Sequence, residues 1–185
     1  MAKRNLKIIA IGGVPASGKT TLMIALRNKL EYKSKFKFGK LVGECYTNNV
    51  FLLGIYDKEL FSGTDRLSMA VQPDTVKFIE KLTKMPGNYT IIYEGDRLFN
   101  DSFIKKAKEY ADCSIYILVA DAETIEQRHI SRNDKQTSKF KKSRKTKIKN
   151  IYETYTKEIK LLTNKSDKHL SNNLEIIWQD LKNTK

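Results

Sequence analysis

Short apolar runs alternate along this chain with stretches in which apolar residues recur at helical spacing. Residues 8–11, 89–93 and 114–120 are almost entirely apolar, which is typical of strands buried on both faces of a sheet. Leu22, Leu26 and Leu30 follow the first run at the spacing that places them on one face of a helix. Strands that alternate with helices predict an α/β fold with a doubly wound, mostly parallel sheet, which binds its ligands at the carboxyl ends of its strands.

The remaining pattern predicts further elements on the same plan. Residues 33–46 and 50–56 are β-rich and are separated by Thr47-Asn48-Asn49, which predicts an antiparallel hairpin inserted beside or over the sheet. Further helices are expected over residues 73–84, 102–111, 122–131 and 138–162, and a last strand over residues 174–178. We expect a single domain over residues 1–185, with the hairpin insertion at about 33–56 and a lid and basic helix at about 128–162.

Residues 13–20, between the first strand and the first helix, read GVPASGKT and fit the phosphate-binding pattern G-x-x-x-x-G-K-[ST]. Gly13 and Gly18 permit backbone conformations that a Cβ would forbid, so that successive N–H groups can point at an anion. Lys19 is expected to reach the β- and γ-phosphates of ATP, and the Thr20 hydroxyl to bind Mg²⁺. Such a loop can arise by chance, but the strand before it and the helix after it favour nucleotide binding. The expected ATP site also includes Ala16, Ser17 and Thr21.

Acidic residues follow the strand predicted over 89–93. The sequence Glu94-Gly95-Asp96-Arg97 lies where nucleotide-processing proteins keep an acid for Mg²⁺ or for its water shell. Glu94 is nearest the strand end and is the expected metal ligand, whereas Asp96 would bind the metal or take a proton from an acceptor hydroxyl. Arg97 would hold an anionic acceptor. A purely structural turn would explain one carboxylate, but it explains two acids and an arginine less well.

A second acid and base, Asp65 and Arg66, follow Gly63-Thr64 on a separate loop. Asp65 either caps a short helix or orients and deprotonates the acceptor. In the second case Arg66 would bind the acceptor's phosphate through two parallel hydrogen bonds. Of the two candidate bases we expect Asp96 rather than Asp65, because Asp96 shares its loop with Glu94.

Arg128 and Arg132 are four residues apart and therefore share one face of the helix expected over 122–131. A polar loop follows at residues 133–137. Arginines on a mobile lid can neutralise a phosphoryl group during transfer, and we expect this catalytic role here. The alternative is that both are ordinary surface arginines.

The net charge of the chain indicates a further binding partner. Lys and Arg number 35 against 21 Asp and Glu, a net charge of +14, which exceeds what phosphates of a small substrate need and favours a polyanion such as nucleic acid. Seven of the basic residues fall within residues 139–149, where Lys141, Lys142 and Arg144 are candidate contacts to substrate phosphates. A solvated helix face, or a surface that is generally rich in lysine, would also explain the run.

Membrane and secreted classes are disfavoured. No apolar run is long enough to cross a bilayer, and the first strand begins too early for a signal peptide. Cys45 and Cys113 lack the spacing of a zinc site, so ordinary buried thiols are expected. We expect a cytoplasmic protein without a membrane partner.

Asn164-Lys165-Ser166-Asp167 matches N-K-x-D, the guanine-binding signature of GTPases. In GTPases this signature ends a strand and accompanies an upstream D-x-x-G. Here we expect it to end the long helix, and no D-x-x-G follows the glycine loop at a suitable place. The sequence therefore disfavours a GTPase.

The loop GVPASGKT, the acidic EGDR and the paired arginines Arg128 and Arg132 resemble the P-loop kinases that include nucleotide and deoxynucleoside kinases. More narrowly, the chain resembles the phage-type P-loop kinases associated with thymidine hypermodification, which phosphorylate the 5-hydroxymethyl group of 5-hydroxymethyluracil in DNA. This resemblance implies a P-loop kinase fold, ATP and Mg²⁺ as cofactors, DNA as substrate and the host cytoplasm as location. The hairpin insertion and the basic run depart from nucleoside monophosphate kinases, which disfavours a free mononucleotide as acceptor.

The sequence therefore predicts an ATP- and Mg²⁺-dependent kinase that acts on a hydroxyl of a nucleic-acid acceptor, with 5-hydroxymethyluracil in DNA as the preferred candidate. Two alternatives stay open. One is a kinase of a free nucleotide, nucleoside or other small metabolite. The other is a nucleic-acid-stimulated ATPase or binding module.

Overall fold

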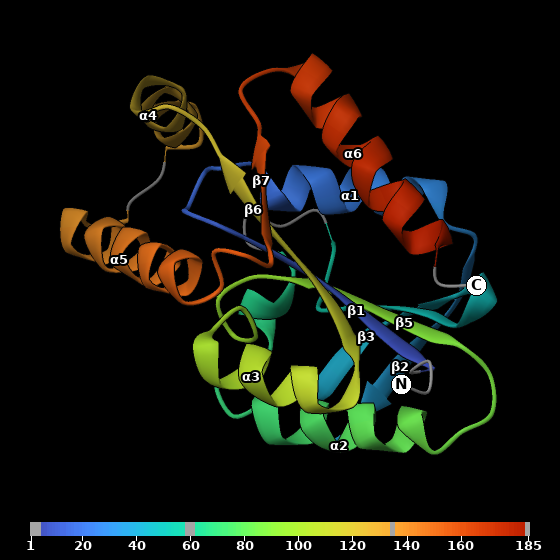
Figure 1. Cartoon of the computed structure of the whole chain (residues 1–185). Coiled ribbons are helices and arrows are strands. Elements are labelled where there is room, and N and C mark those ends of the chain that lie inside the picture. The colour runs from blue at the N-terminus through green and yellow to red at the C-terminus, as the bar shows by residue number, and fades with distance from the viewer. Residues whose placement is uncertain (1–4, 58–61, 134–135, 184–185) are drawn as a thin grey trace.

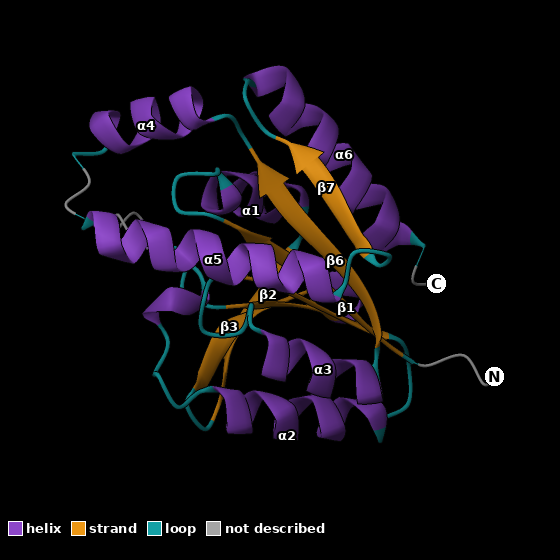
Figure 2. Cartoon of the chain, turned by 60° about the vertical axis from the view of Figure 1, so that its left-hand side comes forward, coloured by secondary structure: helices purple, strands orange, loops and turns teal. Residues whose placement is uncertain are grey.

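The computed structural model describes residues 5–57, 62–133 and 136–183 and shows an α/β fold (Figures 1 and 2). Within these residues the strands form one seven-stranded sheet in the order β2-β3-β4-β5-β1-β6-β7. The strands are β1 (Leu6–Gly13), β2 (Tyr32–Phe38), β3 (Leu41–Tyr46), β4 (Val50–Leu53), β5 (Tyr89–Glu94), β6 (Asp112–Val119) and β7 (Ile159–Thr163). The helices are α1 (Lys19–Lys29), α2 (Gln72–Thr83), α3 (Asp101–Tyr110), α4 (Ala122–Ser131), α5 (Ser138–Thr154) and α6 (Asp167–Lys182), with short 3-10 helices η1 (Thr47–Asn49) and η2 (Thr64–Arg66).

The central strand β1 pairs in parallel with β5 on one side and with β6 on the other. Strands β4 and β7 extend this parallel part beyond β5 and β6. Ile11 lies opposite Glu94, and Gly13 lies opposite Leu118, so the three central strands end at the same edge of the sheet. The prediction of an α/β fold with a mostly parallel sheet is confirmed, and the loops that follow β1, β5 and β6 lie together.

Helices cover both faces of the sheet (Figure 1). On one face, buried side chains of α2, α3 and α5 pack against the strands. On the other face, α1 and α6 contribute a second core through residues such as Leu22, Leu26 and Ile177. Because both faces are covered, the central strands carry continuous apolar runs instead of alternating ones.

The predicted hairpin is present and lies beside the parallel sheet. Strands β3 and β4 are antiparallel, and η1 joins them through Asn48 and Asn49, both with positive φ. Residues 33–46 hold two antiparallel strands, β2 and β3, where the sequence suggested one β-rich run. Strand β4 then pairs in parallel with β5, so the insertion continues the sheet at its edge.

Two predicted elements near the carboxyl end are wrong. The helix predicted over 138–162 ends at Thr154, and Ile159 and Leu162 belong to strand β7. Residues 174–178, predicted as a strand, lie inside α6, where Asn173, Ile177 and Leu181 share the buried face at helical spacing. A short apolar run fits a strand and a buried helix equally well, and the packing of α6 against α1 decides between them.

The longest helix of the described part of the chain, α5, has 17 residues and is rich in lysine. No described helix is long and apolar enough to cross a membrane.

Candidate functional site

The Gly13–Thr20 loop connects β1 to α1 and curls so that two of its glycines cannot be replaced without strain. Gly13 and Gly18 have φ of 145° and 93°. A Cβ on Gly18 would lie 2.2 Å from Asn164 Nδ2, and one on Gly13 would lie 2.5 Å from Ser17 Oγ. The first turn of α1 has no acidic residue and no side-chain cap. The amide groups of this helix end are therefore available to an anion, as the loop pattern predicted.

The Lys19 ammonium lies across this loop. Its Nζ donates to the carbonyl oxygens of Gly13 and Val14, at 3.0 and 3.1 Å. Lys19 also lines a cavity of about 100 Å³ that contains Thr20, Asp65 and Glu94. The loop, the ammonium and two carboxylates thus meet in one place.

Thr20 and Glu94 form the site that best suits a divalent cation. Thr20 Oγ1 donates to Glu94 Oε1 at 3.1 Å, and Glu94 is 1% exposed. Burial raises the pKa of Glu94 from 4.5 to about 7, while the nearby Lys19 acts in the opposite direction. A hydroxyl and one carboxylate fit Mg²⁺, which takes most of its ligands from water and substrate phosphates. No cluster of three His, Cys, Asp or Glu among the described residues forms a complete cage for a metal.

The η2 loop is fastened onto the end of β5. Thr64 Oγ1 donates to the Glu94 carbonyl at 2.7 Å, and Asp65 Oδ1 accepts from the Asp96 amide at 2.6 Å. Burial, followed by the neighbouring Asp96 charge, raises the pKa of Asp65. Asp65 lines the cavity that contains Lys19 and Glu94. Its side chain accepts a hydrogen bond from an amide of the loop after β5, so it does not cap the helix that contains it.

Asp96 has different surroundings. Its Oδ2 lies 2.8 Å from Arg144 Nε, and Lys147 Nζ lies 3.0 Å from its carbonyl oxygen and 3.4 Å from Oδ1. Both cations come from α5, so this ion-paired contact fixes the basic helix to the loop that follows β5. Asp96 does not line the cavity that contains Lys19. This geometry gives no support to our preference for Asp96 over Asp65 as the base. It also gives no support to the contact predicted between Arg144 and a substrate phosphate, because the Arg144 guanidinium pairs with Asp96.

Arg66 and Arg97 also differ from expectation. Arg66 pairs with Asp57, and Arg97 Nε donates to the Leu67 carbonyl at 3.4 Å. Neither guanidinium lines the cavity that contains Lys19. The structure therefore gives no support to the phosphate contact predicted for Arg66 or the acceptor contact predicted for Arg97.

Arg128 and Arg132 do reach the glycine loop. Arg128 donates through a terminal guanidinium nitrogen to the Ala16 carbonyl at 3.3 Å, and burial, together with the neighbouring Arg132, lowers the pKa of Arg128. Arg132 lines the cavity that contains Lys19. The two arginines share a helix face as predicted. Residues 134 and 135 of the predicted lid lie outside the described residues.

A second cavity, of about 260 Å³, shares Gly18 and Arg132 with the cavity that contains Lys19. Its other lining residues include Thr21, Arg128, Asn164, Lys165 and Asp167. Asn164 directly follows β7, so the expectation that Asn164-Lys165-Ser166-Asp167 ends a helix is wrong. Its Nδ2 donates to the Ser17 carbonyl at 2.7 Å and ties this motif to the glycine loop.

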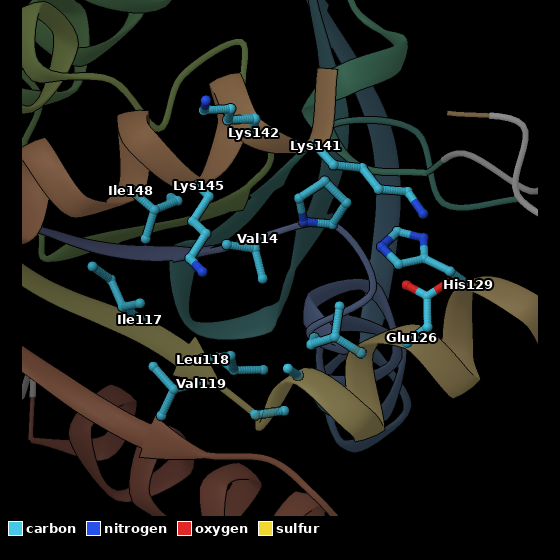
Figure 3. A pocket seen from close by; sticks show the side chains of 14 residues that line it. Val14, Ile117, Leu118, Val119, Glu126, His129, Lys141, Lys142, Lys145 and Ile148 are labelled. Atoms are coloured by element: carbon cyan, nitrogen blue, oxygen red, sulfur yellow. The ribbon is translucent and has the colours of Figure 1, made fainter. Parts of the chain in front are cut away.

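A third cavity, of about 440 Å³, lies between the outer side of the glycine loop, the end of β6, α4 and α5. Val14 and apolar residues of β6 form its wall, and Lys141, Lys142 and Lys145 lie along the α5 side. Figure 3 shows Lys145 reaching toward Val14 and Lys141 pointing toward His129 of α4. The basic run thus has two sides, one at this cavity and the other, with Arg144, at Asp96.

Three residues with functional positions were missed. Lys147 contacts Asp96, and Asn164 binds the glycine loop. The N-K-x-D match was the one signal in the sequence that pointed to Asn164. Tyr56 is 6% exposed, and its hydroxyl makes no hydrogen bond with a described residue. Burial and the Glu94 charge raise the pKa of Tyr56, so its hydroxyl lies in the field of the cavity carboxylates. No pattern in the sequence indicated Tyr56.

The sequence was compared with protein-family models and with curated protein sequences, and neither comparison gave a match.

Proposed function

We propose that this chain is an intracellular, Mg²⁺-dependent phosphotransferase of P-loop kinase type, which transfers the γ-phosphoryl group of a nucleoside triphosphate to a hydroxyl. The observation that carries the proposal is the convergence of Lys19, Thr20, Glu94 and Asp65 on one cavity at the mouth of a glycine loop. These are the charges and ligands that phosphoryl transfer requires. ATP is the donor that the resemblance implies.

Each residue has a role that its position supports. The loop amides and Lys19 would bind the β- and γ-phosphates, and Arg132 would neutralise charge that develops during transfer. Thr20 and Glu94 would hold Mg²⁺, which supplies further charge neutralisation. A bond forms between the acceptor oxygen and the γ-phosphorus while the bond to the β-phosphate oxygen breaks.

Asp65 is the proposed proton acceptor for the attacking hydroxyl. It lines the cavity beside Glu94, and its raised pKa makes it a better base than an ordinary aspartate. Asp96, whose oxygens contact Arg144 and Lys147, would instead hold α5 in place.

A nucleic-acid acceptor, with 5-hydroxymethyluracil in DNA as the preferred candidate, is supported by the charge and by the third cavity. Lys141, Lys142 and Lys145 form no ion pair with a described residue, and they border an apolar cavity next to the loop. Ammonium groups beside an apolar wall suit the phosphates and the base of a nucleotide unit.

The test is to incubate the protein with Mg²⁺ and triphosphate labelled at the γ-phosphate. The acceptor panel contains nucleosides, nucleotides, unmodified DNA and DNA containing 5-hydroxymethyluracil. Label in DNA supports the full proposal, and label in a monomer supports a small-molecule kinase. Release of inorganic phosphate alone, stimulated by DNA, would replace the proposal with an ATPase.

A further inference from the structure

We infer that Tyr56 is a positioning residue for Glu94, whose carboxylate it holds by a hydrogen bond when that carboxylate binds Mg²⁺. This inference rests on the proposed function, because it concerns the metal site of the phosphotransferase. Tyr56 does not line the cavity that contains Lys19, so it would act through Glu94 and not on the substrate.

The Tyr56 hydroxyl is a buried polar group without a partner among the described residues. The residue is 6% exposed, and its hydroxyl oxygen forms no hydrogen bond with any residue that the structure describes. A buried polar group that stays unpaired costs free energy, and such groups are rare in folded proteins. Among charged groups, Glu94 acts most strongly on this hydroxyl, followed by Asp65. We therefore expect the missing partner among the carboxylates of the site.

The local fold brings Tyr56 to the end of β5. Ile55 and Gly63 form an antiparallel bridge, in which the Ile55 amide donates at 3.1 Å and the Gly63 amide at 2.9 Å. Directly after Gly63, the Thr64 hydroxyl donates to the Glu94 carbonyl at 2.7 Å. These backbone contacts fix the segment that carries Tyr56 beside the Glu94 side chain.

Gly63 lies between the two groups and has no side chain to separate them. Its φ of 83° and ψ of −151° lie in a region that glycine alone adopts readily. A Cβ at this position would lie 2.3 Å from Glu94 Oε1 and 3.3 Å from the Tyr56 hydroxyl oxygen. The carboxylate oxygen and the hydroxyl therefore border one small space. A small movement of the tyrosine ring, or one bridging water molecule, would complete the hydrogen bond between them.

The chemistry of a metal-binding carboxylate gives this hydrogen bond its role. A tyrosine hydroxyl ordinarily keeps its proton up to about pH 10, so it donates to an ionised carboxylate. Because Mg²⁺ requires near-ideal octahedral geometry, a carboxylate that a donor has already oriented binds it more tightly. Loss of such a supporting hydrogen bond typically weakens metal binding by about tenfold to a hundredfold.

The experiment compares wild type with Tyr56→Phe, which removes only the hydroxyl. Titration calorimetry measures the binding of a non-hydrolysable ATP analogue over a series of free Mg²⁺ concentrations, and in EDTA without Mg²⁺. The Mg²⁺ concentration that gives half of the maximal tightening should be about tenfold to a hundredfold higher for Tyr56→Phe, while binding in EDTA should be unchanged. Without Mg²⁺ the variant should melt at or above the wild-type temperature, because phenylalanine leaves no buried hydroxyl unpaired.

Tyr89→Phe is the matched control. Tyr89 is 7% exposed and lies at the opposite end of β5 from Glu94, where its hydroxyl donates to the Pro86 carbonyl at 2.8 Å. Removing this hydroxyl should lower the melting temperature, because it breaks an existing hydrogen bond, and should leave the Mg²⁺ dependence of analogue binding unchanged.

An unchanged Mg²⁺ midpoint in Tyr56→Phe overturns the inference and leaves the proposed function intact. Analogue binding that weakens equally in EDTA and in Mg²⁺ also overturns it, because a general disturbance of the site would then explain the loss. Failure of Mg²⁺ to tighten analogue binding by the folded wild-type protein would overturn the proposed function together with the inference.

Discussion

Replacing Glu94 by glutamine should stabilise the protein at neutral and alkaline pH while removing the proposed metal ligand. Glu94 is buried, and its raised pKa means that the folded protein favours the protonated, neutral form. In the unfolded chain this carboxyl loses its proton near pH 4.5. Wild type therefore loses stability as the pH rises from about 4.5 to about 7, and the penalty is complete above pH 7.

The magnitude follows from the same two values. A rise from 4.5 to about 7, at 1.36 kcal/mol for each pH unit, corresponds to about 3 kcal/mol. Glutamine has the shape of glutamate, its amide oxygen can accept the Thr20 hydroxyl, and it carries no charge at any pH. Glu94→Gln should therefore be more stable than wild type by up to about 3 kcal/mol at pH 8 and nearly equal to it near pH 4.5.

The assay is urea denaturation of both proteins at several pH values between 4.5 and 8, without Mg²⁺ or nucleotide. Glu153→Gln, at an exposed position on α5, is the control and should show no such pH-dependent gain. A Glu94→Gln protein that is less stable than wild type at pH 8, or a difference that does not change with pH, would refute the reasoning about burial. Added Mg²⁺ should reduce the stability difference, because it binds the wild-type carboxylate.

Two further predictions concern the base and the basic helix. Asp65→Asn should lower kcat by a factor of about 10² to 10⁴ with little change in nucleotide affinity, because it removes the proposed base. Asp96→Asn should mainly lower the melting temperature, because it releases α5. Steady-state kinetics and thermal melts distinguish these outcomes, and a larger loss of kcat in Asp96→Asn would restore Asp96 as the base. If α5 contacts DNA, a plot of log affinity against log salt should be steep and linear, and it should flatten when glutamine replaces the three lysines of the third cavity, Lys141, Lys142 and Lys145. The control replaces three exposed lysines of edge strand β2, Lys33, Lys35 and Lys37. Equal slopes for both triple variants would argue against contact through α5.

The parts of the site that sequence predicted are those that local pattern controls. The glycine loop is fixed by its own eight residues, from Gly13 to Thr20, and Glu94 lies at the end of a strand that its apolar run identifies. Because parallel strands end at a common edge, the meeting of Thr20 with Glu94 follows from the topology.

The parts that sequence missed depend on contacts between distant elements. Asp96 lies two residues after Glu94 in the chain, but its ion pairs come from α5, about fifty residues later. Asn164 becomes part of the loop's environment only because residues 159–163 form strand β7 beside β6, where the pattern suggested a continued helix. Tyr56 is one apolar residue among many in the sequence, and its position near Glu94 comes from the fold of the insertion.

The most direct measurement of the central claim is transfer of labelled γ-phosphate to DNA containing 5-hydroxymethyluracil, compared between wild type and Lys19→Ala. Lys77→Ala, an exposed lysine on α2, is the matched control. The account predicts Mg²⁺-dependent label in DNA for wild type and Lys77→Ala, and loss of transfer in a Lys19→Ala protein that melts as wild type does. Transfer by Lys19→Ala at a rate near that of wild type would contradict it.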